Sequence, residues 1–351
     1  MSSTPSCLPS GTDPSRPSAR GRMVRRWALA ALALAAVAEA QTPLASRLIN
    51  LSVRTKLAAG ENLITGFVLT GTEPALVLVR GVGPGLVPFG VADAMPNPKI
   101  TLIDSRGASL INDDWGPPGV PPPTLPVETP VFTLPASGVV VVAFPIPVGG
   151  VGLVFVPSPI AGAFPLPVNS RDASLLVELK GGAYTLNVAG SANTDAGTVL
   201  AEVYDASIDS ELGASSTRLI NLSARGVAGP GAPLIAGFVV DGTVPKPLLL
   251  RVTGPMLTAF GVAGAAVDTR LELMDQLGAV IRSNDNWDSG SAAETLELRQ
   301  AATRAGAFPY QAGSRDAAVV VTLPPGLYTL RGSGVDGVNG VVLLEIYDLQ
   351  D

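Results

Sequence analysis

The chain has 351 residues, of which 47% are hydrophobic, only 5% are aromatic and 15% are charged, and its net charge is −6. This length suffices for two domains with their own cores, and the low charge excludes a disordered polyelectrolyte and a coiled coil. An acidic chain without basic clusters also excludes nucleic acid and an anionic membrane surface as partners. Frequent valine, with 39 glycines and 32 prolines, predicts many short strands joined by tight turns.

Residues 1–40 are expected to be an N-terminal extension that ends in a secretory signal peptide at about 23–40. Two arginines precede an apolar run too short for an easy membrane span, and Ala38-Glu-Ala40 has the small-residue pattern of a cleavage site. Cleavage after Ala40 would remove five arginines and two acidic residues and would change the net charge to −9. Met23 is an alternative start. These features predict a secreted or cell-surface protein with no membrane span after signal removal.

The residues that the mature chain lacks exclude several chemistries. The only cysteine, Cys7, would be removed with the signal segment, and the sequence contains no histidine. The mature chain therefore has no disulfide, no thiol nucleophile, no Ser-His-Asp triad and no histidine-ligated zinc. Its glycines lie in turns between strands and form no phosphate-binding fingerprint.

Arg47-Leu-Ile-Asn-Leu-Ser52 begins the first of two copies of one module. The same six residues return 171 positions later, from Arg218 to Ser223, and the elements after them return in the same order. Alternating apolar stretches bounded by turn signals recur in both copies. The sequence predicts an all-β chain of two tandem antiparallel β-sandwich, jelly-roll-like domains with about eight strands each. The domains are expected at 46–208 and 216–351.

The two copies differ most after a segment that reads Asn112-Asp-Asp-Trp115 in the first copy and Asn284-Asp-Asn-Trp287 in the second. Beyond this segment the first copy is longer by 28 residues. In the second copy, Ser291 and Glu294 have capping-box spacing and Gly306 is a stop signal, which predicts a short helix. The first copy instead has a Pro-rich insert at 116–160. Its helix-breaking residues favour an irregular insert with one or two extended segments over a membrane-spanning helix. A local reading-frame error is a third interpretation.

The end of each module carries a spaced pattern. In the second copy, Leu273-Met-Asp275 and Asn284-Asp-Asn-Trp287 precede Ser314-Arg-Asp316, Pro325-Gly-Leu-Tyr-Thr329 and Leu344-Glu-Ile-Tyr-Asp348. This pattern resembles the β-sandwich, jelly-roll-like accessory modules of secreted bacterial proteins, of the pre-peptidase C-terminal type. The N-terminal half of each module departs from that family's pattern. The resemblance implies a β-sandwich fold, and related jelly-roll modules can bind calcium near such loops.

An acidic hairpin is the strongest candidate site in each copy. Its side chains are hard oxygen ligands from a turn, which suit calcium, and no other cofactor is expected. The candidate calcium ligands are Asp104, Asn112, Asp113, Asp114, Asp275, Asn284, Asp285 and Asn286. The alternative is that these side chains cap strand ends through hydrogen bonds to the backbone.

Two repeated residue types are weaker candidates. Trp115 and Trp287 could stack on a sugar ring as ligand-binding residues, although burial in the core is the favoured interpretation. Arg80 and Arg251 each end an apolar strand, and Arg171-Asp172 recurs as Arg315-Asp316, a pair of adjacent charges. They could grip a ligand carboxylate, whereas the favoured interpretation is an internal Arg–Asp pair that fixes loops over the sandwich.

Together these features predict a non-catalytic secreted or cell-surface protein that binds or adheres to an extracellular glycan or protein, or acts as a spacer. One alternative is a polysaccharide hydrolase that works with carboxylates alone, Glu202 with Asp205 and Glu345 with Asp348. Another is a structural extracellular component that self-associates through its sheets. The sequence predicts neither the ligand nor the oligomeric state.

Overall fold

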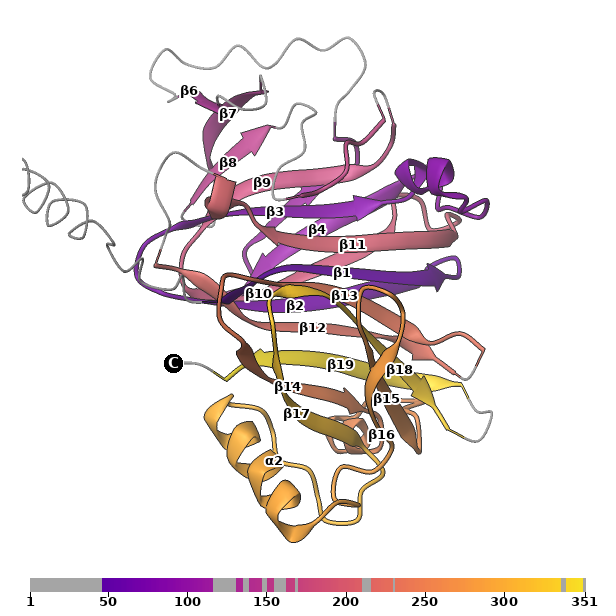
Figure 1. Cartoon of the computed structure of the whole chain (residues 1–351). Coiled ribbons are helices and arrows are strands. Elements are labelled where there is room, and N and C mark those ends of the chain that lie inside the picture. Colours follow the sequence, from indigo (N-terminus) through magenta and orange to yellow (C-terminus); the bar gives the residue numbers. More distant parts are fainter. Residues whose placement is uncertain are drawn as a thin grey trace, which may run out of the picture. The chain divides into compact units, whose positions relative to one another are not determined.

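The computed structural model describes residues 46–115, 131–134, 139–146, 150–154, 162–167, 170–209, 216–229, 231–335 and 339–349 (Figure 1). The expected signal peptide, with its cleavage site after Ala40, lies outside the described residues, as does most of the insert at 116–160. The described part is mainly antiparallel β-structure, which confirms the all-β sandwich expected from the sequence. No helix in this part is long and apolar enough to cross a membrane.

The first repeat contains eight strands that have counterparts in the second repeat. They are β1 (Arg47–Leu57), β2 (Asn62–Thr70), β3 (Ala75–Val82), β4 (Pro98–Asp104), β5 (Ser109–Asn112), β9 (Ala173–Leu179), β10 (Gly182–Gly190) and β11 (Gly197–Asp205). Two 3-10 helices, η1 (Pro84–Phe89) and η2 (Ala206–Asp209), follow β3 and β11. Strand β2 alternates strictly between buried and more exposed positions, as expected for a strand with one face on a core.

The second repeat has the expected eight strands and the expected helix. The strands are β12 (Arg218–Ala228), β13 (Leu234–Asp241), β14 (Lys246–Thr253), β15 (Thr269–Met274), β16 (Val280–Asn284), β17 (Ala317–Leu323), β18 (Gly326–Gly334) and β19 (Gly340–Asp348). The 3-10 helix η3 (Pro255–Phe260) follows β14, and the helix is α2 (Ala292–Arg304). Ser291 and Glu294 form a reciprocal capping box at its start, and Gly306 adopts a left-handed φ of 68° just beyond its end.

The first repeat has more strands than its eight shared ones, because its insert holds three extended segments where one or two were expected. Three further strands are present there: β6 (Val131–Leu134), β7 (Val139–Ile146) and β8 (Gly150–Val154). They form an antiparallel meander whose last strand pairs with β9. The physical reason is that an unpaired edge of β9 offers backbone donors and acceptors to any adjacent extended segment, and valine-rich segments satisfy them readily.

Two long sheets run through both repeats (Figure 1). In the first sheet, the order is β5-β4-β10-β2-β12-β19-β14-β17. In the second, it is β16-β15-β18-β13-β1-β11-β3-β9-β8-β7-β6. Each sheet therefore begins in one repeat and ends in the other, an arrangement that the division into two tandem sandwiches did not anticipate.

The strands that begin with the duplicated six residues form the joint between the repeats. Arg47 on β1 lies opposite Asp241 on β13, and Arg218 on β12 lies opposite Thr70 on β2. These two pairs are related by the same 171-residue offset as the sequence copies, and both registers shift at the corresponding place. Such reciprocal pairing is the pattern of an isologous two-fold interface, here between two halves of one chain.

One hydrophobic core serves both repeats. It includes Phe67 and Leu48 from the first repeat and Phe238 and Leu219 from the second, all with 1% or less of their surface exposed. Phe67 stacks on Tyr184, and Phe238 stacks on Tyr328 in the same way. The outer faces of the sheets do not contribute side chains to this shared core. The candidate sites lie on these outer faces or at the ends of the sheets.

Candidate functional site

A buried arginine lies on the outer face of the first sheet in the second repeat. Arg251 of β14 is opposite Glu345 of β19, and only 1% and 3% of their surfaces are exposed. The Nε atom of Arg251 is 3.3 Å from Oε2 of Glu345, and the Tyr347 hydroxyl donates a 2.6 Å hydrogen bond to Oε1. The carboxylate is thus held by neighbours on both of its oxygens. Burial and the nearby negative charge of Glu345 both raise the pKa of Tyr347, which keeps this hydroxyl protonated as a donor.

Two aromatic rings enclose the guanidinium group of Arg251. After the left-handed turn at Gly306, the chain places the ring centroids of Phe308 and Tyr310 at 4.2 Å and 4.1 Å from Cζ of Arg251. The Nη1 atom of Arg251 donates a 2.9 Å hydrogen bond to the Phe308 carbonyl, and the Tyr310 hydroxyl lies 2.5 Å from Thr253 Oγ1. Cation–π contacts of this kind favour the charged arginine in a desolvated place.

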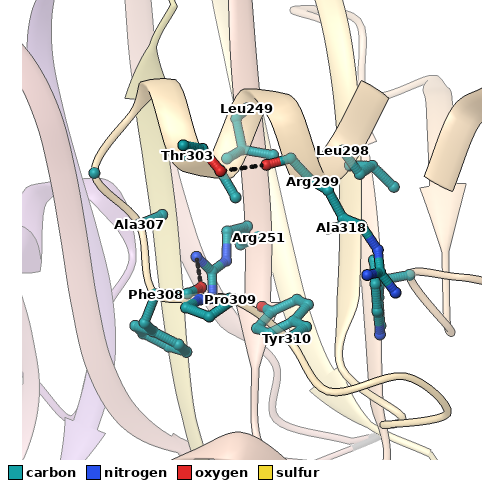
Figure 2. A pocket seen from close by; sticks show the side chains of 13 residues that line it. Leu249, Arg251, Leu298, Arg299, Thr303, Ala307, Phe308, Pro309, Tyr310 and Ala318 are labelled. Carbon is teal, nitrogen blue, oxygen red and sulfur yellow. Dashed lines mark hydrogen bonds between the residues drawn. The ribbon is translucent and has the colours of Figure 1, made fainter. Parts of the chain in front are cut away.

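This assembly forms the floor of a pocket of about 480 Å³ beneath α2. Figure 2 shows Leu298, Arg299 and Thr303 of the helix along one side and Phe308, Pro309 and Tyr310 along the other, with Arg251 between them. The lining residues are Leu249, Arg251, Trp287, Leu298, Arg299, Ala302, Thr303, Gly306, Ala307, Phe308, Pro309, Tyr310 and Ala318. The pocket is therefore mainly apolar, with two cations and no acidic residue in its lining.

The first repeat has the same arginine with a tighter ion pair. Nη2 of Arg80 is 2.5 Å from Oε2 of Glu202, and Nη1 donates a 2.6 Å hydrogen bond to the Phe164 carbonyl. The Phe164 ring lies 4.4 Å from Cζ of Arg80, but the position of Tyr310 is taken by Leu166, which is buried. The insert that stands in place of α2 is described only in part, so the comparison extends to the floor alone.

Asp104 and Asp275 lie at the turns of the two acidic hairpins. The Asp104 carboxylate accepts hydrogen bonds from the amides of Arg106 and Ala108, and it also pairs with the Arg106 side chain. In the second repeat, Asp275 accepts from the amides of Leu277 and Ala279. Partial desolvation opposes the ionised form of Asp104, but the hydrogen bonds outweigh it and lower the pKa of this carboxyl.

The remaining candidate ligands lie at the other end of the hairpin. Asn112 is opposite Ile100, four residues from Asp104 along β4, and the rise of a strand puts about 13 Å between the two ends. Asn112 Oδ1 accepts from the amide of Ser174, and its amide group donates to the Asp114 carbonyl. Asn284 makes the equivalent bonds to Ala318 and Asn286.

These registers mean that Asp104 and Asn112 cannot bind one calcium ion, whose ligands lie within about 2.3–2.6 Å of the metal. The full hairpin set is therefore not one site in either repeat. Among the described residues, Asp104, Asn112, Asp275 and Asn284 act as caps of turns and strand ends. Asp113 accepts a 3.1 Å hydrogen bond from the Ser191 hydroxyl, and Asp285 accepts one from the Asn286 amide group. Calcium binding at the Asn-Asp end stays a prediction, and a fall in melting temperature on chelation would support it.

Both tryptophans are buried, as the favoured interpretation expected. Trp115 is 6% exposed and packs with Val82, Leu86 and Leu166, while Trp287 is 3% exposed. Trp115 Nε1 donates to Ser170 Oγ, and Trp287 Nε1 donates to the Gln311 carbonyl. Trp287 nevertheless lines the pocket, where its ring meets Tyr310 edge to face at 5.9 Å.

Arg315 forms an ion pair with an aspartate, Asp268, at 2.9 Å, but the expected Arg–Asp pair was wrong in its acidic partner for Arg80 and Arg251. Both arginines pair with the glutamate of the last strand of their repeat. Asp172 instead accepts hydrogen bonds from the amides of Gly83 and Gly85, and Asp316 accepts from those of Gly254 and Met256. A buried aspartate that binds backbone amides fixes the loop after β3 or β14 without needing the arginine.

Gly162-Ala-Phe164 recurs in the sequence as Gly306-Ala-Phe308, and the repeat by itself indicated no role for this element. The missed signal was an arginine within one apolar strand, Arg251 in β14, and a glutamate within another, Glu345 in β19, together with the aromatic Phe308 and Tyr310. A lone buried charge requires a partner, and an opposite charge in another apolar strand is the natural one.

Comparison with known proteins adds no assignment. No family model matches the chain, and no curated protein matches it. One similar solved structure is the S161A mutant of the Bacillus subtilis oxalate decarboxylase OxdC, with 12% sequence identity over 88% of this chain and 74% of that chain. Its TM-score is 0.13, so this likeness carries no argument about fold or activity.

Proposed function

We propose that this protein is a non-catalytic extracellular binding protein whose ligand occupies the pocket beneath α2. The pocket itself carries the proposal, because about 480 Å³ of space is lined by aromatic and aliphatic side chains around a buried arginine. Small-ligand sites typically have volumes of roughly 300–1,000 Å³, apolar walls and a few converging polar groups. The first repeat is then a partner that completes the sheets, and the second repeat carries the binding site.

The arrangement of carboxylates favours binding over hydrolysis. Glu345 is engaged by Arg251 and Tyr347, and Asp348 is buried with its Oδ2 atom 2.7 Å from Nζ of Lys246. Neither residue belongs to the lining of the pocket. Hydrolysis of a glycosidic bond by carboxylates needs two of them on opposite sides of a substrate, whereas these two hold strands together.

Filling the pocket tests this proposal. In the Ala302→Trp variant, the new indole would project from the face of α2 that lines the pocket and would fill the cavity. Ala293→Trp is the control, because Ala293 is an exposed residue of the same helix outside the pocket lining. A fragment screen by ligand-observed NMR should give hits that bind the wild type and Ala293→Trp and fail to bind Ala302→Trp. Hits that bind all three proteins equally would place binding elsewhere and overturn the proposal, provided that thermal melting shows both variants folded.

The extracellular part of the proposal rests on the sequence of residues 23–40. Expression with the native N-terminus and mass spectrometry of the exported protein should give a chain that begins at Gln41. A glycan array with this mature chain tests the alternative that an extracellular glycan is the partner.

A further inference from the structure

We infer that the pocket beneath α2 selects an amphipathic oxyanion, a carboxylate or similar acidic headgroup attached to an apolar body. This inference rests on the proposed binding function and adds the chemical class of the ligand. It depends on three observations: a buried arginine with only a loose ion pair at the floor of the cavity, a second arginine at the same cavity, and an apolar remainder of the wall.

The guanidinium group of Arg251 is paired more loosely than that of its counterpart in the first repeat. Nη2 of Arg80 lies 2.5 Å from the Glu202 carboxylate, whereas the nearest ion-pair contact of Arg251 with Glu345 is through Nε at 3.3 Å. Nη2 of each arginine is buried and has no acceptor in hydrogen-bonding geometry among the described residues, but only in Arg80 does this atom have a carboxylate at 2.5 Å to balance its charge. Phe308 and Tyr310 cover the guanidinium, so its positive charge, and not a direct hydrogen bond, would attract an anionic group in the adjoining cavity.

A second cation lies at the same cavity. Arg299 of α2 is exposed, and its Cζ atom lies 5.2 Å from the ring centroid of Trp287. It forms no ion pair with an acidic side chain in the described part of the chain. The protein as a whole is acidic, with a net charge of −6, so a pocket with two arginines and no lining carboxylate is a local exception. Arginine is well suited to a planar oxyanion because it presents paired N–H donors.

The rest of the wall suits hydrocarbon. Leu249, Leu298, Ala302, Ala307 and Ala318 contribute aliphatic surface, and the aromatic floor adds more. Removing apolar ligand surface from water is favourable in proportion to its area, so an alkyl or aryl body would supply binding energy that a bare anion lacks. A ligand with both parts matches the whole pocket, whereas an inorganic anion or a neutral alkane matches only one part.

Three probes of equal chain length separate these contributions: decanoate, decan-1-ol and decyltrimethylammonium. Titration calorimetry with the full mature chain at pH 7 should show decanoate binding at least about tenfold more tightly than decanol, with no measurable binding of the cation. Arg299→Gln should weaken decanoate binding about three- to tenfold and leave decanol unchanged. Arg304→Gln, which removes an exposed arginine of the same helix outside the pocket lining, is the matched control and should bind like the wild type.

The outcomes distinguish the ligand class from the proposed function. Decanoate and decanol binding with equal affinity, both abolished by Ala302→Trp, would overturn the oxyanion preference while supporting the pocket as a binding site. Failure of all three probes, together with pocket-dependent hits of other chemistry in the fragment screen, would also overturn the oxyanion class alone. Failure of the probes and absence of any hit sensitive to Ala302→Trp would overturn both proposals. Decyl sulfate in place of decanoate then shows whether the headgroup must be a carboxylate.

Discussion

Arg80 and Glu202 lie opposite each other on β3 and β11, with Nη2 of the arginine 2.5 Å from Oε2 of the glutamate and both side chains buried. Ser52 and Tyr204 also donate hydrogen bonds to this carboxylate, which leaves it well compensated. Removing one partner of such a pair leaves the other buried and uncompensated, whereas removing both leaves a site that apolar side chains can fill.

We therefore predict that Glu202→Leu lowers the free energy of unfolding by about 3–5 kcal/mol. The double variant Arg80→Met, Glu202→Leu should recover most of this loss, because no unpaired charge remains. Urea unfolding followed by tryptophan fluorescence measures both values. A double variant as unstable as the single one would show that packing of the arginine, and not its charge, matters at this place.

The loss of stability on replacing a glycine by alanine should depend on whether the glycine lies at the joint between the repeats. Gly242 has a φ of 119°, and a Cβ atom built there would lie 2.6 Å from Cα of Ser46, the residue just before β1. Gly71 meets Thr217 in the same way across the other half of the joint. Gly264, in the loop before β15, also has a positive φ, of 68°, but a Cβ atom added to it would have no neighbour within 4 Å.

Gly264→Ala should thus cost only the conformational penalty of about 1–2 kcal/mol, whereas Gly242→Ala should cost more, because backbone atoms of the other repeat must also move. Thermal and urea unfolding of the two variants test this difference. Equal losses of unfolding free energy in the two variants would mean that Ser46 and its neighbours move aside at no energetic cost. The joint would then be less tightly packed than the strand register implies.

Asp316 predicts a pH dependence of stability with a definite sign. Burial raises the pKa of this carboxyl above its ordinary value of 3.8, although hydrogen bonds from the Gly254 and Met256 amides act in the opposite direction. The folded state then binds the proton more tightly than the unfolded state. The stabilisation from this group is complete below pH 3.8 and is lost as the pH rises through the folded-state pKa.

The comparison variant is Asp316→Asn, which cannot ionise. The free energy of unfolding of the wild type minus that of the variant should fall as the pH rises from about 3 to 7. Urea unfolding at intervals across this range measures the difference and cancels the contributions of other carboxyls, such as Asp104, whose lowered pKa acts in the opposite sense. A difference that grows with pH would show that the backbone amides dominate over burial at Asp316.

Local features of the fold could be predicted from the sequence, whereas most of the site could not. Alternating residues located the strands, and Ser291 with Glu294 located the start of α2, because both signals act over a few neighbouring residues. The pairing of β1 with β13 escaped prediction because an exposed strand edge accepts any partner of similar length. The pocket could not be predicted for a related reason. Arg251 and Phe308 are 57 residues apart in the chain, and only the folded sheet brings them together.

In the acidic hairpins, residues that are close in sequence lie far apart in the structure. The hairpin itself was predicted, and its turn lies at Gly107, but closeness in sequence suggested one cluster of ligands that the strand register separates. Asp104 lies at the turn and Asn112 pairs with Ile100 at the far end, so residues eight positions apart are held at opposite ends of one hairpin. Sequence proximity indicates a shared site only where the chain folds back within that distance.

The reciprocal joint leads to the last prediction, which concerns the second repeat alone. In the full chain, β12 pairs with β2 and β13 pairs with β1, each across the boundary between repeats. An isolated fragment of residues 216–351 would expose β12 and β13 as unpaired edges. Because the two cross-boundary pairings are equivalent under the 171-residue offset, β12 of one fragment can replace β1 against β13 of another. We therefore expect this fragment to be a symmetric dimer.

Light scattering after size exclusion should give twice the mass of the fragment. Leu219 provides the control, because it lies opposite Leu48 at the centre of the joint and would face its own copy in the dimer. Leu219→Glu would place two carboxylates together there and should abolish the dimer, whereas Leu277→Glu, at a residue that is 85% exposed on the turn between β15 and β16, should leave it intact. A stable, monodisperse monomer of the unmodified fragment would contradict the prediction, since it would show that β12 and β13 do not need a second repeat to satisfy their edges.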